Sequence, residues 1–238
     1  MPRMTVTGSI DPLLSVTLEK GEVVFAERNA MVAMDDTLAL TGSTRGGLFS
    51  ALSRKLFNDE SFFEQRIEAV DGPGEALLTP TLPGDVAVLD VGEHSYMISD
   101  GSYLASTEGV EIEVKSQGLG RAILGDSGGF FIMHASGRGS IAVSGFGSMR
   151  AITLDGSRSV YVDNGHLVAW DAALKYELAL NTAKKGFFGK LLHSQTSGEG
   201  VVLKFSGTGT LYVSSRNRGG FVDWLFNQQP QEKAPKNE

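Results

Sequence analysis

The sequence predicts an all-β protein, and three observations support that class. Glycine accounts for 30 of 238 residues, above the usual share of about 7%, which favours many tight turns. Residues 135–144 (ASGRGSIAVS) return in register at 205–214 (FSGTGTLYVS), with a looser copy at 70–78 (VDGPGEALL). A turn, an apolar strand, a polar turn and a second apolar strand recur at 21–34, 92–106 and 156–170. We interpret this second element as one hairpin present three times.

Duplication at a spacing of about 64 to 72 residues indicates that one supersecondary unit was copied and its copies packed together. We therefore expect a single all-β domain over residues 1–226, made of three antiparallel repeats at about 13–85, 86–155 and 156–226. A chain of this length buries roughly 70 to 75% of its unfolded surface, so it needs no metal or disulfide for stability. Residues 227–238 are nearly devoid of apolar side chains, which predicts a disordered tail.

Short apolar or alternating runs predict the strands of each repeat. In the first repeat they lie at 13–18, 23–26, 31–34, 38–41, 62–70 and 76–79. In the second they lie at 86–91, 96–98, 103–105, 110–114, 130–133 and 140–143. In the third they lie at 160–162, 167–170, 174–180, 201–205 and 211–213, and 222–226 is expected to be a last docked segment. A second hairpin is expected around Gly137-Arg138-Gly139 and its counterpart at Gly207, and Pro80 to Asp85 is expected to be a loop.

Each repeat also carries an insert between its later strands. Helical spacing at 47–57 predicts a short amphipathic helix with Leu48, Phe49, Leu52, Leu56 and Phe57 on one face. Its counterparts are the glycine-rich residues 118–129 and the segment 184–192, which contains Phe187, Phe188, Leu191 and Leu192 between lysines 184, 185 and 190. Apolar residues bordered by Lys and Arg suit a membrane surface or a partner groove, and packing within the fold or an oligomer is the favoured alternative.

Composition argues against several classes of protein function. A formal charge of −7 and a pI near 5.2 oppose binding to nucleic-acid backbones. The absence of cysteine removes thiolate catalysis, zinc ribbons and a disulfide scaffold. With no leader-like start and no apolar run of about 20 residues, we expect a soluble, cytoplasmic protein.

The string Gly125-Asp126-Ser127-Gly128-Gly129 matches the nucleophile motif of chymotrypsin-like proteases. Such a serine acts only beside a histidine that a carboxylate orients, and the upstream histidine, His94, lies within a predicted hairpin. The repeat places Ser127 in a loop that leads into a strand, where small residues serve a turn. We therefore expect no catalytic residue here and no enzymatic activity.

No metal or cofactor site is predicted. Histidines 94, 134, 166 and 193 have no ligand spacing, and Asp35-Asp36 is expected to solvate a turn. Gly118-Leu119-Gly120 and Gly137-Arg138-Gly139 lack the strand-to-helix context and the Gly-Lys-Ser/Thr ending of phosphate-binding loops.

Taken in order, several motifs resemble the family named for altered inheritance of mitochondria protein 24. They are Gly46-Gly47-Leu48-Phe49, Glu60-Ser61-Phe62-Phe63, Gly72-Pro73-Gly74-Glu75, Pro83-Gly84-Asp85, Gly101-Ser102-Tyr103-Leu104-Ala105-Ser106, Gly128-Gly129-Phe130-Phe131, Ser136-Gly137-x-Gly139 and Asp163-Asn164-Gly165-His166-Leu167-Val168-Ala169. The resemblance implies a fold similar to the tryptophan RNA-binding attenuation protein, with three β-sandwich-like units about a pseudo-threefold axis. It brings no reaction and no catalytic residues, and its eukaryotic members are associated with the mitochondrial inner membrane.

We accordingly expect a non-enzymatic structural or interaction protein, homo-oligomeric as a trimer or ring and peripheral to a membrane or membrane complex. Fold analogy alone supports the alternative of a small-ligand or RNA-binding module.

Overall fold

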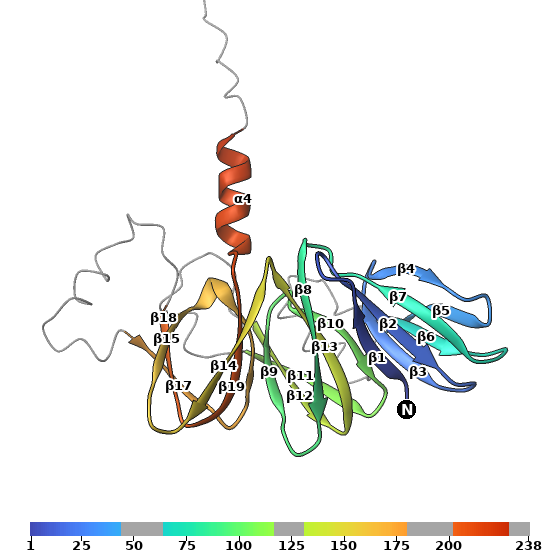
Figure 1. Cartoon of the computed structure of the whole chain (residues 1–238), viewed down its shortest axis with the longest axis horizontal. Coiled ribbons are helices and arrows are strands. Elements are labelled where there is room, and N and C mark those ends of the chain that lie inside the picture. The colour runs from blue at the N-terminus through green and yellow to red at the C-terminus, as the bar shows by residue number, and fades with distance from the viewer. Residues whose placement is uncertain (44–63, 117–130, 180–201, 229–238) are drawn as a thin grey trace, which may run out of the picture.

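The computed structural model describes residues 1–43, 64–116, 131–179 and 202–228. Within these residues the chain forms four antiparallel sheets and one α-helix (Figure 1). Sheet A contains, in spatial order, β1 (Arg3–Thr7), β2 (Leu13–Leu18), β7 (Gly74–Leu78) and β4 (Met31–Met34). Sheet B contains β5 (Leu38–Ser43), β6 (Glu64–Ala69), β3 (Val23–Glu27), β10 (Tyr103–Thr107), β13 (Gly139–Phe146) and β8 (Gly84–Val91).

The third segment of the chain completes the sheets. Sheet C contains β11 (Val110–Ser116), β12 (Phe131–Gly137), β9 (Tyr96–Ser99), β16 (Leu167–Asp171), β19 (Thr208–Ser214) and β14 (Met149–Asp155). Sheet D contains β15 (Val160–Asp163), β18 (Val202–Ser206) and β17 (Lys175–Leu178). A 3₁₀ turn (Asn164–His166) joins β15 to β16, and α4 (Arg218–Asn227) follows β19. The all-β prediction is confirmed.

Strand pairing follows one order in three successive six-strand segments, which we name unit 1 (β2–β7), unit 2 (β8–β13) and unit 3 (β14–β19). In each unit the sixth strand lies between the first and the third, and the fifth lies between the second and the fourth. The third strand of one unit also pairs with the second strand of the unit before it, as β10 does with β3 and β16 with β9. The units therefore share sheets B and C and lie in a row (Figure 1).

The prediction of three hairpins at 21–34, 92–106 and 156–170 is wrong. The two strands of each element lie in different sheets: β3 pairs with β6 and β10, whereas β4 pairs with β7. The same division separates β9 from β10 and β15 from β16. The polar turn carries the chain from one layer of a sandwich to the other, and apolar side chains of the two layers pack together in one core.

The Gly-x-Gly sites are also corners between layers and not hairpin turns. Gly137-Arg138-Gly139 joins β12 in sheet C to β13 in sheet B, and the equivalent glycines at 207 and 209 join β18 to β19. Gly137 has a φ of +89°, and a Cβ there would overlap the carbonyl oxygen of Gly109. Glycine is required at this corner because the left-handed conformation and the close backbone approach both exclude a side chain.

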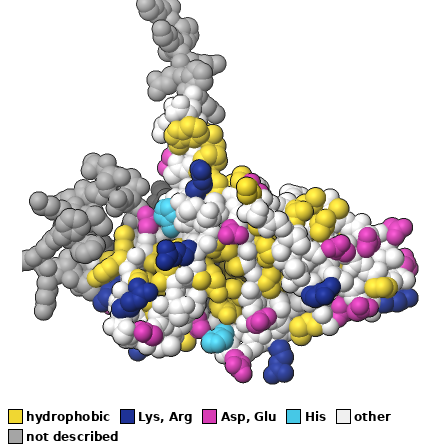
Figure 2. Space-filling view, viewed as in Figure 1, with side chains coloured by type: hydrophobic (Ala, Val, Ile, Leu, Met, Phe, Trp, Pro, Cys, Tyr) yellow, Lys and Arg dark blue, Asp and Glu magenta, His cyan; other side chains and the backbone are white. Residues whose placement is uncertain are grey.

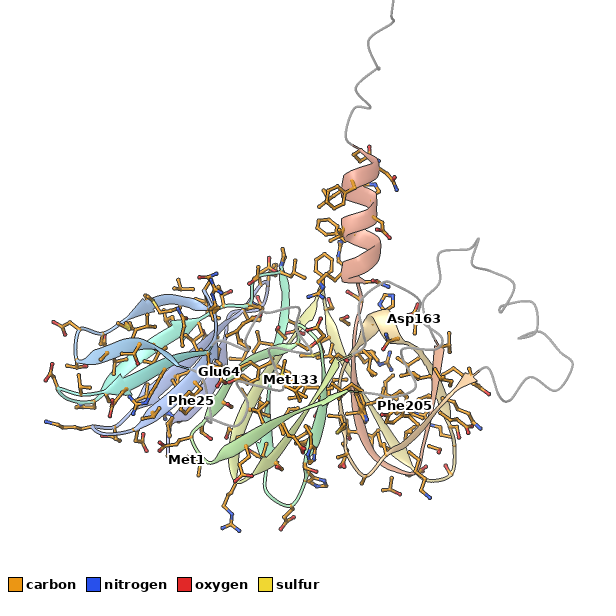
Figure 3. The ribbon with its side chains drawn as sticks, turned by 180° about the vertical axis from the view of Figure 1, so that it is seen from behind. Met1, Phe25, Glu64, Met133, Asp163 and Phe205 are labelled. Atoms are coloured by element: carbon orange, nitrogen blue, oxygen red, sulfur yellow. The ribbon has the colours of Figure 1, made fainter. Side chains whose placement is uncertain are left out.

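Each unit encloses a hydrophobic core between its two layers. Leu14, Val16 and Leu78 of sheet A share one cluster with Val24 and Ile67 of sheet B. The second cluster fills unit 2, and the third, in unit 3, contains Trp170 and Phe205 (Figure 3). Because strands of a neighbouring unit contribute to each cluster, burial extends across the shared sheets.

A buried polar contact marks the junction of units 1 and 2. The hydroxyl of Tyr103 donates to Glu64 Oε1 at 2.6 Å and lies 2.9 Å from Ser106 Oγ. Glu64 is 1% exposed, and Figure 3 shows it near Phe25, whose carbonyl lies 3.3 Å from the same hydroxyl. The contact therefore ties β6, β3 and β10 together at the point where the two units meet.

Other expectations need correction. Strands β1 and β14 were not predicted, the first because the repeat pattern begins after it and the second because it is largely exposed. Residues 222–226 belong to α4, which has no buried residue and so is not docked as expected. Asn227 ends that helix and is not the start of a tail.

The inserts at 47–57, 118–129 and 184–192 lie outside the described residues, but they connect equivalent strands: β5 to β6, β11 to β12 and β17 to β18.

Candidate interaction surface

The helix α4 stands clear of the sheets and presents apolar side chains to its surroundings (Figures 1 and 2). Asn217 caps its first turn by accepting a hydrogen bond from the amide of Gly220 at 3.2 Å. The exposed fractions of its apolar residues are 38% for Val222, 56% for Trp224, 46% for Leu225 and 66% for Phe226. A cluster of large exposed apolar side chains on one short element is typical of a contact surface.

The base of α4 is fixed to the sheets by aromatic and charged contacts. The ring of Phe221 packs edge-on against Phe146 of β13 with 5.2 Å between centroids, and the guanidinium of Arg216 lies 5.8 Å from the Phe146 ring centroid. Arg218 donates to Asp100 at 3.2 Å across the turn between β9 and β10. These contacts set the direction of the helix, so its outer turns project from the body in a defined orientation.

A groove of about 520 Å³ lies at the foot of the helix. It is lined by the turns that end the second strands of the units, and its polar lining includes Glu27, Ser99, Asp100, Asn164, Asn217 and Arg218. Among the described residues, Ser99 Oγ and Asn164 Oδ1 are buried there without a hydrogen-bond partner. Such groups are available to a polar ligand.

The carboxyl group of Glu27 is unusual within this groove. Burial raises its pKa from the ordinary 4.5 to about 7. The positive charge of Arg218 opposes that rise and the negative charge of Asp100 adds to it. A perturbed carboxyl group beside a cavity is a common property of binding sites.

The structure pairs His94 with a carboxylate, whereas the serine of the protease-like string lies outside the described residues. His94 Nδ1 lies 2.8 Å from Asp171 Oδ2, and the backbone amide of Ala173 also donates to Asp171. Ser127 and the Gly118 loop lie outside the described residues.

The other candidate residues that the structure describes, His134, His166 and Asp35, make contacts within the fold. His166 donates from Nδ1 to the carbonyl of Ser214 at 2.9 Å, and His134 Nδ1 lies 3.9 Å from Glu113 on the paired strand. Asp35 accepts from the amide of Glu75 at 2.8 Å, which fits a turn. In the part of the chain that the structure covers, no three His, Asp or Glu side chains gather as metal ligands; His193 lies outside it.

Sequence reasoning missed both α4 and the groove. The helix had a local signal, since Asn217 is a favourable cap followed by a dense aromatic run. The groove had none, because Glu27, Ser99 and Arg218 come from three distant parts of the chain.

Comparisons with known proteins identify relatives along nearly the whole chain. An uncharacterised protein of Streptococcus pyogenes serotype M6 is 34% identical over 235 residues, which cover 96% of this chain and 91% of that protein. A crystal structure of a Streptococcus pyogenes protein from a structural genomics consortium superposes with a TM-score of 0.76 at 31% identity, covering 96% of this chain and all of that one. The model of the family described as mitochondrial biogenesis AIM24 matches residues 4–216, and the chain belongs to this family.

Proposed function

We propose that this chain is a non-enzymatic structural or interaction protein that self-associates and contacts a membrane surface through α4. The observation that carries the proposal is the undocked helix with Trp224, Leu225 and Phe226 exposed at its outer turns. Aromatic and aliphatic side chains of this kind insert into the boundary between headgroups and acyl chains. Among the described residues, no helix has both the length and the apolar character needed to span a bilayer, so the contact would be peripheral.

The recurring strand order supports the view that the chain contains three copies of one unit. Each unit pairs its strands in the same sequence, and corresponding corners carry Gly74, Gly139 and Gly209. The likeness to the tryptophan RNA-binding attenuation protein and a cytoplasmic location stay predictions of this proposal. The described units lie in a row in which units 1 and 3 do not pair, so they differ from the expected arrangement about a pseudo-threefold axis. A repeated unit with exposed strand edges favours assembly into larger homo-oligomers.

Flotation with vesicles of neutral phosphatidylcholine tests the membrane contact. Neutral lipid is chosen because the protein's charge of −7 would be repelled by an anionic surface. The double variant Trp224→Ser with Phe226→Ser should lose most of the floated fraction. The matched control, Ile10→Ser with Val70→Ser, removes two exposed apolar side chains away from the helix and should float like the unaltered protein. Equal flotation of both variants, or no flotation of the unaltered protein, would refute the membrane contact.

The groove supports a second candidate function, binding of a small polar ligand. Its volume falls within the range of about 300 to 1,000 Å³ for ligand pockets, and Ser99 and Asn164 offer buried polar atoms. Thermal-shift measurements with a panel of amino acids and sugars should give a stabilisation that Asn164→Ala abolishes. A panel without any shift speaks against this function. The other part of this alternative is RNA binding, which would retain RNA on the filter in a low-salt binding assay. Because the net charge of the protein is −7, we expect no RNA to be retained.

A further inference from the structure

The groove at the foot of α4 is lined by the turn that joins the second strand to the third in all three units. Glu27, Ser99 and Asp163 end the second strands of units 1, 2 and 3. Each occupies the same place before the bulge that the following third strand shows in every unit. Glu27, Ser99 and Asn164, which follows Asp163, line the groove, and Figure 3 shows Asp163 on the same side of the sheets as α4. The groove therefore crosses the row from unit 1 to unit 3.

The three equivalent side chains have different partners. Asp163 accepts a hydrogen bond from the amide of Gly165 at 2.8 Å and so closes its own turn. Ser99 is 5% exposed, and its Oγ has no partner among the described residues. In the same part of the chain the carboxyl group of half-buried Glu27 forms neither a hydrogen bond nor a salt bridge. The fold thus uses the side chain of unit 3 and leaves those of units 1 and 2 open to the groove.

The open groups in the groove are hydrogen-bond acceptors. The Oδ1 atom of Asn164 is buried without a partner among the described residues, and an amide oxygen can only accept. An ionised carboxylate such as that of Glu27 also only accepts, while the hydroxyl of Ser99 can accept or donate. Because buried polar groups are normally hydrogen-bonded, a ligand that complements this groove has to supply donors.

The positive charge beside Glu27 already has a partner. The guanidinium of Arg218 donates to Asp100 at 3.2 Å. The N-terminus of α4, whose partial positive charge would favour an anion, is capped by Asn217. An anion would therefore compete with Asp100 and Asn217, whereas a cation would meet the unpaired carboxylate of Glu27.

We propose that the groove binds the protonated amino group of a small primary amine, with Glu27 as its counter-ion and Ser99 and Asn164 as hydrogen-bond acceptors for the ligand. A primary ammonium group combines three N–H donors with one positive charge, which matches one carboxylate and two neutral acceptors. Hydrogen bonds between such charged groups are roughly twice as strong as neutral ones. The inference rests on the proposed binding of a small polar ligand in this groove and names the chemical class of that ligand.

Ethanolamine and choline test this chemistry as a matched pair. Both carry one positive charge and one hydroxyl group, but the nitrogen of choline has no hydrogen to donate. Isothermal titration calorimetry at pH 8, in a buffer free of primary amines, should detect binding of ethanolamine. Choline should bind at least about tenfold more weakly, because its charged nitrogen cannot donate to the acceptors. Equal affinities for the two compounds would overturn the proposal.

Substitutions identify the residues that hold the amine. Glu27→Gln keeps the size of the side chain and removes its charge, so ethanolamine should bind at least about tenfold more weakly. Ser99→Ala removes a neutral acceptor and should weaken binding about threefold to tenfold. Circular dichroism verifies that both variants are folded. Glu111→Gln removes a carboxylate from exposed β11 and should bind ethanolamine like the unaltered protein. An unchanged affinity in Glu27→Gln would contradict the role of this carboxylate as the counter-ion.

The pH dependence of binding gives an independent readout. Burial raises the pKa of Glu27 to about 7, the positive charge of Arg218 on α4 opposes the rise, and the negative charge of Asp100 adds to it. Among the described residues, the other charged groups near Glu27 are Arg216, which lines the groove, and Glu64, opposite it on β6. A primary ammonium group keeps its proton well above pH 7, as lysine does. The affinity for ethanolamine should therefore fall about tenfold from pH 8 to pH 6, and Glu27→Gln should remove that fall.

The amine has two possible sources, because the groove lies at the foot of the helix proposed to contact a membrane. One is a soluble amine, and the other is the headgroup of phosphatidylethanolamine. If the headgroup is the ligand, vesicles that contain this lipid should float more protein than vesicles of phosphatidylcholine alone, and Glu27→Gln should lose the difference. Equal flotation together with binding of ethanolamine in solution assigns the groove to a soluble amine. Absence of both effects would overturn the proposal.

Three further outcomes separate the amine site from the general ligand-binding function of the groove. If a sugar stabilises the protein through Asn164 and ethanolamine does not bind, the groove is a ligand site and the amine is refuted. If inorganic phosphate binds in place of ethanolamine and Arg218→Gln abolishes that binding, the groove is an anion site and the amine is again refuted. If none of these compounds binds, both the ligand-binding function and the amine site are refuted.

Discussion

Replacing Glu27 with Gln should make the stability of the protein less dependent on pH. Burial raises the pKa of this carboxyl group from 4.5 to about 7, so the folded protein binds a proton more tightly than the unfolded chain. Between those values the folded state holds more protons, and stability therefore falls as the pH rises from 4.5 to 7. At about 1.4 kcal/mol for each pKa unit the loss of stability reaches at most about 3.5 kcal/mol. Partial exposure of Glu27 to solvent reduces it to about 1 to 2 kcal/mol.

The assay is urea unfolding of both proteins at pH 4 and pH 8. At pH 4 Glu27 is protonated in both states and Gln resembles it, so the two midpoints should agree. At pH 8 Glu27→Gln should be more stable by about 1 to 2 kcal/mol, or roughly 2 to 8 °C in the melting temperature. Glu111→Gln, on an exposed part of β11, is the control. The reasoning would be refuted if Glu27→Gln were less stable than the unaltered protein at pH 8, or if the difference in stability between the two proteins were the same at both pH values.

Three substitutions test the corners, the junction and the core by urea unfolding at pH 7. Gly137→Ala should cost about 3 kcal/mol or more, since its Cβ would overlap the carbonyl oxygen of Gly109; a cost under about 1 kcal/mol would contradict the corner's geometry. Tyr103→Phe should cost about 1 to 3 kcal/mol because it removes the hydroxyl donor to buried Glu64, and an unchanged midpoint would mean that the contact is dispensable. Trp170→Ala should cost about 3 to 5 kcal/mol because the side chain is fully buried, and an unchanged midpoint would contradict its place in the core.

Much of the strand pattern could be predicted from the sequence, but the pairing could not. Residues 23–27 and 103–107 are buried nearly throughout, since one face meets the unit's own core and the other meets the neighbouring unit. Continuous apolar runs of this kind are typical of strands covered on both faces. A polar turn looks the same in a hairpin and in a crossing between layers, so the turn residues alone gave the wrong topology.

The candidate surface was predictable only in part. Asn217 and the aromatic residues after it indicate a helix, yet their apolar character also suggests burial, and the structure leaves Trp224 exposed. The groove depends on Glu27, Asp100 and Arg218 meeting in space. Because these residues are far apart in the sequence, no local sequence pattern predicts that they lie close together in the structure.

The sharing of sheets between units governs how the chain can be divided. A fragment that ends at Val91 would contain β8 without β10 and β13, the strands that join it to the rest of sheet B. Truncation at the predicted boundaries near residues 85 and 155 would thus cut through hydrogen-bonded layers and leave apolar strands bare. The interlocked layers link the folding of each unit to that of its neighbour, so cooperativity extends along the row although the pattern of the sequence is modular.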